Sequence, residues 1–244
     1  MTDMVFYERA VPLNRDRHHK LKIDVRQNDF SFAAKTNSVL LAGSELAEAA
    51  RDYPIVFVGQ EGGPFTMAAL LGLEANRNLF VDEQGRWSPN TYLPAFARRY
   101  PFVLAGTDAS EDLTVCIDEA CEYLGEASGE ALFGADGQEA AYLKNVLDFL
   151  RLFHTEMTRT SAFAARLAEL GLLVPKVIAV EREGKKQQLE GLWVVDEVRL
   201  GQLGDEQSVS LLRSGYLGWI HAHLLSLGNV ARLARRMDES SVPA

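Results

Sequence analysis

One long amphipathic stretch, Gln138–Leu170, constrains the fold of this 244-residue chain more than any other feature. Its apolar side chains recur at intervals of three, four or seven residues, which is the spacing of one face of an α-helix. They are Leu143, Leu147, Leu150, Phe153, Met157, Ala164 and Leu167. Unbroken, such a helix is about 50 Å long. The patch Thr158–Ser161 is the expected place for any break, and Gly171 is the expected end.

The segments around this helix alternate between strand-like and helix-like patterns. Predicted strands are Asp29–Lys35, Pro54–Val58, Phe65–Leu71, Asn78–Val81, Phe102–Leu104 and a hairpin of Val177–Glu181 with Gln187–Val195. Predicted shorter helices are Glu45–Arg51, Leu93–Arg99, Asp205–Arg213, Tyr216–Leu227 and Val230–Met237. The alternation predicts an α/β (mixed α+β) fold in which a mixed sheet is flanked by helices.

An internal repeat is visible in the first half of the chain. The sequence from Ala50 to Phe57 matches the sequence from Ala97 to Leu104, 47 residues later, around a shared Tyr-Pro pair. A second echo follows, because Leu79-Phe80 with Gly85 resembles Leu132-Phe133 with Gly137. We interpret this as a degenerate duplication of a helix, Tyr-Pro, strand and turn unit.

The predicted organisation has three parts. Residues 1–28 lack clear periodicity and are expected to form an irregular basic arm. Residues 29–236 are expected to form a single α/β domain with a sub-boundary near 137, and residues 237–244 a flexible tail. A chain of this length can bury a sizeable core without disulfides or metal.

Charge is distributed unevenly along the chain. The net charge of −9 argues against general nucleic-acid binding. Residues 9–26 carry a net charge of +4, whereas residues 100–143 contain ten acidic residues and no Lys or Arg. The two blocks are either solvated faces of opposite sign or binding surfaces. In the second case the acidic block binds a basic partner, a cation or the arm of a neighbouring copy, and we expect the arm to act through Arg15, Arg17, Lys20 and Lys22.

The start of the chain has no basic region followed by an apolar stretch, so no secretory signal peptide is expected. The longest apolar run, Met67–Leu73, is far below the ~20 residues that span a bilayer. We therefore expect no membrane span and a cytoplasmic location as synthesised. A place at the cell surface would require a non-classical exporter.

The sequence lacks the residue patterns of several common metal-binding and phosphate-binding sites. Cys116 and Cys121 have no second pair for a zinc site and are expected to be buried thiols. His221 and His223 are two apart on a predicted helix, so they point away from each other. Gly59–Gly63 follows a strand but lacks the Lys and Ser/Thr of a phosphate loop. The sequence indicates no catalytic constellation, no metal site and no cofactor.

One cluster could form a recognition patch. Within nineteen residues it gathers Asp82, Trp87, Tyr92, Arg98, Arg99 and Tyr100. Aromatic groups with two arginines suit a small planar or carboxylate ligand. The alternative is that the aromatic side chains belong to the core and the arginines point to solvent.

The order and spacing of several motifs resemble one bacterial family over nearly the whole chain. They are Tyr7–Asn14, Phe30–Asn37, Tyr53–Phe57, Leu79–Asp82, Tyr100–Val103, Leu113–Asp118 and His223–Asn229. The chain is similar to the SapC family, whose name comes from an association with surface-layer arrays. The peptide-transport permease that shares this symbol is unrelated. The resemblance implies no catalytic residues.

Two functions follow as expectations. The first is a non-enzymatic SapC-like binding or assembly protein, associated with surface layers, that forms a homo-oligomer or binds a protein partner. The alternative is a cytosolic accessory or small-ligand-binding protein with an unrecognised enzymatic role that uses the Trp87–Tyr100 region.

Overall fold

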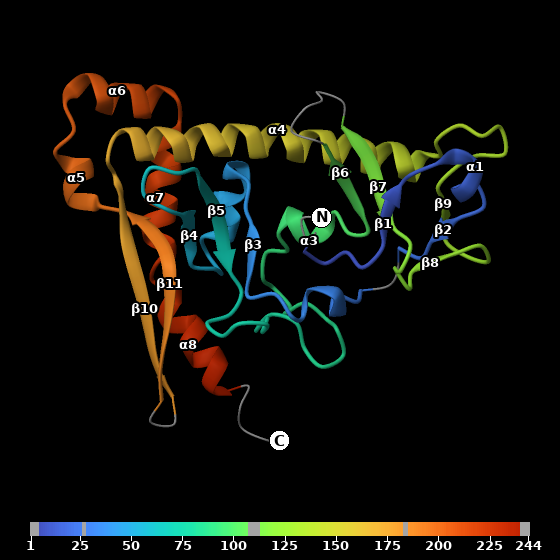
Figure 1. Ribbon diagram of the computed structural model, residues 1–244, viewed down its shortest axis with the longest axis horizontal. Helices are drawn as coiled ribbons and strands as arrows, with labels where there is room; N and C mark the ends of the chain where they lie inside the picture. The colour runs from blue at the N-terminus through green and yellow to red at the C-terminus, as the bar shows by residue number, and fades with distance from the viewer. Residues whose placement is uncertain (1–4, 26–27, 107–112, 183–184, 240–244) are drawn as a thin grey trace.

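The long helix is the spine of the molecule. In the computed structural model, which describes residues 5–25, 28–106, 113–182 and 185–239, α4 runs unbroken from Ala141 to Glu169 across the molecule (Figure 1). Three hydroxyls of the patch where a break was possible, those of Thr158, Thr160 and Ser161, donate hydrogen bonds to carbonyls four residues earlier. The hydrogen-bonding groups of these side chains are therefore paired within the helix and do not interrupt it.

Two groups of strands lie along α4. The larger sheet has the order β10-β11-β4-β5-β3, and every pair in it is antiparallel. Its strands are β3 (Ser38–Leu40), β4 (Ile55–Gly59), β5 (Phe65–Leu70), β10 (Leu173–Arg182) and β11 (Lys185–Val195). The predicted α/β class is confirmed, with antiparallel pairing throughout the described strands.

The smaller group consists of two three-stranded sheets, β1-β7-β6 and β8-β2-β9. Their strands are β1 (Ala10–Pro12), β2 (Lys22–Ile23), β6 (Phe102–Ala105), β7 (Thr114–Asp118), β8 (Leu124–Gly125) and β9 (Glu130–Ala131), with α1 (Arg15–His18) between β1 and β2. The segment expected as an irregular arm thus supplies one strand to each of these sheets.

The internal repeat corresponds to two similar structural units. In the first, α2 (Leu46–Ala49) leads through Tyr53-Pro54 into β4, which pairs with β5. In the second, α3 (Ala95–Arg98) leads through Tyr100-Pro101 into β6, which pairs with β7. Each unit continues into a tight turn closed by one bridge, Val81↔Trp87 and Phe133↔Glu139.

Each of these turns depends on one glycine. Gly85 and Gly137 have φ of 74° and 75°, a left-handed conformation that glycine adopts without steric cost. An earlier strand completes each three-stranded unit, β3 beside β5 and β1 beside β7. The duplication read from short sequence echoes is therefore matched by strand pairing and turn geometry.

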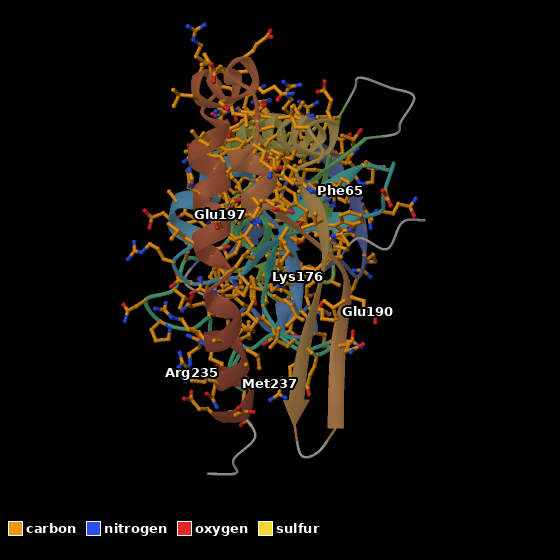
Figure 2. All side chains as sticks on the ribbon, turned by 90° about the vertical axis from the view of Figure 1, so that its left-hand side faces the viewer. Phe65, Lys176, Glu190, Glu197, Arg235 and Met237 are labelled. Carbon is orange, nitrogen blue, oxygen red and sulfur yellow. The ribbon has the colours of Figure 1, made fainter. Side chains whose placement is uncertain are left out.

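The last quarter of the chain packs on the larger sheet. Its helices are α5 (Glu197–Gly201), α6 (Asp205–Arg213), α7 (Tyr216–Ser226) and α8 (Asn229–Glu239). Figure 2 shows α8 beside the β10–β11 hairpin, and Ala179 of β10 lines one groove with Val230 and Ala234 of α8. Met237, at the start of the expected flexible tail, is a buried residue of α8, and residues 240–244 lie outside the described part.

Two separate apolar clusters form the core, and α4 joins them. Its first half buries Leu143, Leu147 and Leu150 against the smaller sheets. Its second half contributes Phe153 and Phe163 to the larger cluster under the five-stranded sheet. The apolar face of α4 that was predicted from sequence therefore packs against both apolar clusters.

Two predicted strands are wrong. The segment Asp29–Lys35 contains the 3₁₀ turn η1 (Ser31–Ala33), because the Asp29 carboxylate accepts hydrogen bonds from the Ser31 N–H and hydroxyl and turns the chain. The segment Asn78–Val81 forms only one bridge. Helices α2 and α3 are also shorter than expected, and α2 is preceded by the 3₁₀ turn η2 (Gly43–Glu45).

Candidate functional site

The six residues of the predicted recognition patch have different environments. Asp82 is exposed and closes its own turn, since its carboxylate accepts hydrogen bonds from the backbone N–H groups of Gln84 and Arg86. The bond from the Arg86 backbone is the main reason that the pKa of Asp82 is lowered. The side chain of Arg86 also pairs with it at 3.0 Å. Asp82 therefore serves the turn that Gly85 completes.

Two further patch residues lie in the core or pack against it. Trp87 is buried, and its Nε1–H donates to the hydroxyl of Tyr53 at 3.1 Å. Arg99 is half-buried, with its guanidinium carbon 3.9 Å from the centre of the Phe96 ring. Burial lowers the pKa of Arg99 and leaves its Nε without a hydrogen-bond partner among the described residues.

Of the remaining three residues, Arg98 and Tyr100 line a cavity, and Tyr92 contacts Arg98 beside it. Arg98 is exposed and donates from Nη2 to the hydroxyl of Tyr92 at 3.2 Å. That hydroxyl donates to the buried carboxylate of Glu45 at 3.0 Å, which also accepts from the backbone N–H of Ala95 at 2.7 Å. Desolvation, with Glu45 beside it, raises the pKa of Tyr92 to about 12. The side chain of Arg98 on α3 is therefore held by Tyr92, whose own position is fixed by Glu45.

The cavity has a volume of about 340 Å³ and is open to solvent. Most of its lining is aromatic or aliphatic. The lining residues are Ile23, Asp24, Val25, Asp29, Phe30, Phe32, Leu93, Ala97, Arg98, Tyr100, Tyr123 and Tyr142. They come from the basic segment, the η1 segment, α3 with its flanks, the segment after β7 and the first turn of α4. Phe30, Phe32 and Leu93 pack against the larger apolar cluster, whereas Ile23, Tyr123 and Tyr142 belong to or pack against the smaller one. The cavity therefore lies where the two apolar clusters meet.

Hydrogen bonds and stacking hold the aromatic walls in place. The rings of Phe32 and Tyr100 stack with centres 4.0 Å apart. The Tyr100 hydroxyl donates to the Asp118 carboxylate at 3.3 Å, and that of Tyr123 donates to the carbonyl of Asp29. Desolvation raises the pKa of both tyrosines. These two hydroxyls are protonated and engaged, so the walls are preformed.

The opposite charge blocks meet within one chain. Arg17 pairs with Glu119 at 2.6 Å and Arg9 pairs with it at 3.3 Å. The buried His18 places Nε2 3.1 Å from the same carboxylate, while its Nδ1 accepts the backbone N–H of Asn14 at 2.9 Å. Beside it, the fully buried carboxylate of Asp118 accepts the backbone N–H groups of Glu8, Arg9 and Ala120. Part of the predicted attraction thus holds the N-terminal segment on β7.

The other proposed partner-binding residues are less constrained. Lys22 reaches the carbonyl of Ala127 at 3.4 Å, at the limit of a hydrogen bond. Arg15 lines a groove of about 570 Å³ with Asp16, Glu139 and Arg151. Arg15 and Lys20 are exposed, and neither forms an ion pair with another described residue.

A second surface feature was not singled out from sequence. Helix α6 lies at one end of the long axis of the molecule (Figure 1). Leu211 is its single buried residue, whereas Val209 and Leu212 are 42% and 63% exposed. Asp205 and Arg213 lie on the same side as Val209, four residues before and after it, and neither forms an ion pair within the described part of the chain. This outer face is apolar in the middle and oppositely charged at its ends.

Neither a cluster of metal ligands nor a membrane-spanning helix occurs in the described residues. In them, no group of three or more His, Cys, Asp or Glu side chains is arranged to hold a metal ion. No helix of that part is both long and apolar enough to cross a membrane.

Comparison with known proteins gives one match. The family model named SapC matches residues 13–233, which is most of the chain. The chain belongs to the SapC family. The match includes the basic segment from Leu13 onward, the cavity and α6. No curated protein and no solved structure matches this SapC-family chain.

Sequence reasoning placed only part of the cavity. Arg98 and Tyr100 were predicted because they lie in one aromatic and basic segment. Phe30, Tyr123 and Tyr142 were not, because they reach the cavity from segments far apart in the chain. The one available signal was that Phe30 and Phe32 alternate with small residues, and that pattern indicated a strand.

Proposed function

We propose that this SapC-family protein is a non-enzymatic binding protein that assembles with a second copy of itself through the outer face of α6. The single observation that carries this proposal is that the face is self-complementary. Residues four apart project from the same side of a helix, so Asp205, Val209 and Arg213 form one row. The row is acidic at one end, apolar at its centre and basic at the other.

A twofold axis through Val209 gives the pairing. Two α6 helices that meet antiparallel about this axis bring Asp205 of one copy opposite Arg213 of the other, and the same pair forms a second time by symmetry. The two Val209 side chains meet at the axis, and Leu212 is covered at the margin. Both Asp205–Arg213 pairs and the apolar contact between the Val209 side chains therefore form in the same arrangement.

The contact is small, which sets its expected strength. One nine-residue helix from each copy buries less than the ~1,200 Å² of a standard complex. The dimer is therefore expected to be weak and to depend on salt, since exposed charges are screened.

An extended array needs a second, head-to-tail contact, because an isologous contact closes after two copies. Arg15 and Lys20, which have no ion-pair partner in the described chain, are the charges left to supply it. Exposed acids of the 122–139 segment, such as Glu126 and Glu130, suit them. The surface-layer association suggested by the family name is the setting that this combination of contacts would serve.

The test uses two charge-reversal variants. Each should fail to dimerise alone, and the two should dimerise with each other. In Asp205→Arg the homodimer faces Arg against Arg, and in Arg213→Asp it faces Asp against Asp. Sedimentation velocity should show both variants as monomers at concentrations where the natural protein dimerises. An equal mixture should dimerise, because each position then meets its opposite charge across the axis.

A control and a second variant keep the result interpretable. Arg235→Asp changes an exposed arginine of α8 that forms no ion pair with another described residue, and it should leave the dimer intact. Val209→Glu puts two like charges at the axis and should abolish the dimer. Circular dichroism reports whether α6 and the fold persist. A natural protein that stays monomeric, or a folded mixture that does not dimerise, contradicts the proposal.

A further inference from the structure

The cavity between the two apolar clusters carries a donor that the protein itself does not satisfy. The guanidinium of Arg98 lies 5.4 Å from the ring centre of Phe149 and 5.8 Å from that of Tyr92. Among the described residues, its guanidinium makes one hydrogen bond, to the Tyr92 hydroxyl, and lies within ion-pairing distance of no carboxylate. An arginine fixed on two rings keeps its other N–H groups free for a planar, two-point acceptor.

Tyr142 supplies a second donor from a different element. It lies in the first turn of α4, lines the same cavity, and its hydroxyl makes no hydrogen bond to the described residues. Desolvation raises its pKa, so the hydroxyl keeps its proton. Tyr100 and Tyr123, in contrast, already donate to Asp118 and Asp29. Of the three tyrosines in the lining, Tyr142 is therefore the one available to a ligand.

The walls and charges restrict what these donors can hold. Flat rings such as those of Phe30, Phe32 and Tyr100 favour a flat apolar body that stacks on them. Asp24 and Asp29 also line the cavity, and two carboxylates in a lining that holds one arginine disfavour phosphate and other polyanions. A volume of about 340 Å³ is at the small end for ligand pockets.

We propose that this cavity binds a small planar monocarboxylate, with the carboxylate on Arg98 and the hydroxyl of Tyr142 and the flat body between the aromatic walls. The carboxylate and guanidinium then form a bidentate, charge-assisted pair. The site is independent of the α6 contact, so the natural protein could use either without the other.

Cinnamate and its uncharged matched amide, cinnamamide, test this directly by isothermal titration. Cinnamate should bind the natural protein at least about tenfold more tightly than the amide, the factor that one charge-assisted hydrogen-bonded pair supplies. Arg98→Gln should weaken cinnamate binding by about the same factor and remove the preference over the amide. Tyr142→Phe should weaken it by a smaller factor, about threefold.

Arg151→Gln provides the matched control, because Arg151 is an exposed arginine of α4 paired with Asp148 and absent from this cavity. The titration is repeated on Val209→Glu, whose cinnamate affinity should be unchanged. The cinnamate titration can therefore be interpreted even if the protein does not dimerise through α6. Equal affinities for acid and amide, unchanged binding by Arg98→Gln, or no binding at about 10 mM cinnamate would each overturn the proposal.

Discussion

The two regions joined by α4 share one structural unit but are stabilised by different interactions. Around the five-stranded sheet the contacts are mainly apolar, and the buried His223 stands among them with Nδ1 lacking a hydrogen-bond partner in the described chain. Around the smaller sheets the apolar cluster is modest, and the fully buried carboxylate of Asp118 accepts three backbone N–H groups, one more than the buried Glu45 carboxylate accepts in the larger region. His18 there has a partner on each ring nitrogen.

The difference shows what each region requires of its sequence. An apolar core tolerates changes of side chain that conserve volume. A buried carboxylate that accepts several N–H groups tolerates almost none, because each orphaned donor costs free energy. The larger region is therefore limited by packing and the smaller one by hydrogen bonding.

The largest expected effect comes from removing a ring from the larger core. Phe163 is fully buried and packs on Phe57, Tyr216 and Trp219 with ring centres 6.0, 5.0 and 5.2 Å away. Phe163→Ala should lower the free energy of unfolding by about 4 kcal/mol. Leu147→Ala, on the part of α4 that faces the smaller sheets, should cost about 2–3 kcal/mol. Urea denaturation measures both, and equal costs would remove the contrast in packing.

A pH titration of stability should report the buried His223. Desolvation lowers the pKa of His223 from its usual 6.5 to about 4 in the folded protein. Between these values the unfolded chain binds a proton that the folded protein does not. Stability should therefore be complete above pH 6.5 and fall by about 3 kcal/mol as the pH approaches 4.

His223→Gln keeps an acceptor for the backbone N–H of Val195, which now bonds Nε2 at 3.1 Å. It should flatten this pH dependence. His221→Gln, an exposed neighbour on α7, should retain the slope. A slope that persists in His223→Gln would show that other groups cause it.

Asp118→Asn tests the polar organisation of the smaller region. The change preserves shape but replaces one acceptor oxygen by an NH₂ group, which leaves the N–H of Glu8 or Arg9 without a partner. We expect a loss of about 2 kcal/mol, with faster amide exchange confined to β1 and β7. Hydrogen exchange read by mass spectrometry locates the effect. Exchange that rises equally in β4 and β5 would argue against a local role.

The smallest expected effect compares the two repeat turns. Alanine at either Gly85 or Gly137 has to adopt a positive φ, which costs about 1 kcal/mol. At Gly85 the added Cβ would also overlap Asp29 and Ser31, whereas at Gly137 it meets only the Arg15 side chain at 3.4 Å. Gly85→Ala should therefore be about 1 kcal/mol more destabilising than Gly137→Ala in thermal or urea denaturation. Equal losses of stability in the two variants would show that the Asp29 and Ser31 side chains move aside without cost.

Features with local causes were predictable from the sequence. The periodicity of 138–170 predicted α4, and the Tyr-Pro pairs predicted where β4 and β6 begin. Features that depend on distant partners were not. The pairing of β1 with β7 needs residues about a hundred positions apart, so residues 10–23 looked irregular in isolation. Arg98 was predicted as a ligand-binding residue from its neighbours, whereas the cavity beside it is assembled from distant segments.

The pairing of β1 with β7 also has a consequence during synthesis. The register sets Val11 opposite Ile117, so the first strand leaves the ribosome long before its partner exists. At ~5–20 residues per second the interval is roughly 5 to 20 s. Throughout it, Arg9 and Arg17 lack Glu119, and the nascent chain presents an unneutralised positive segment. That segment is then open to other anions in the cell, and the acidic block that follows displaces them as the smaller region closes.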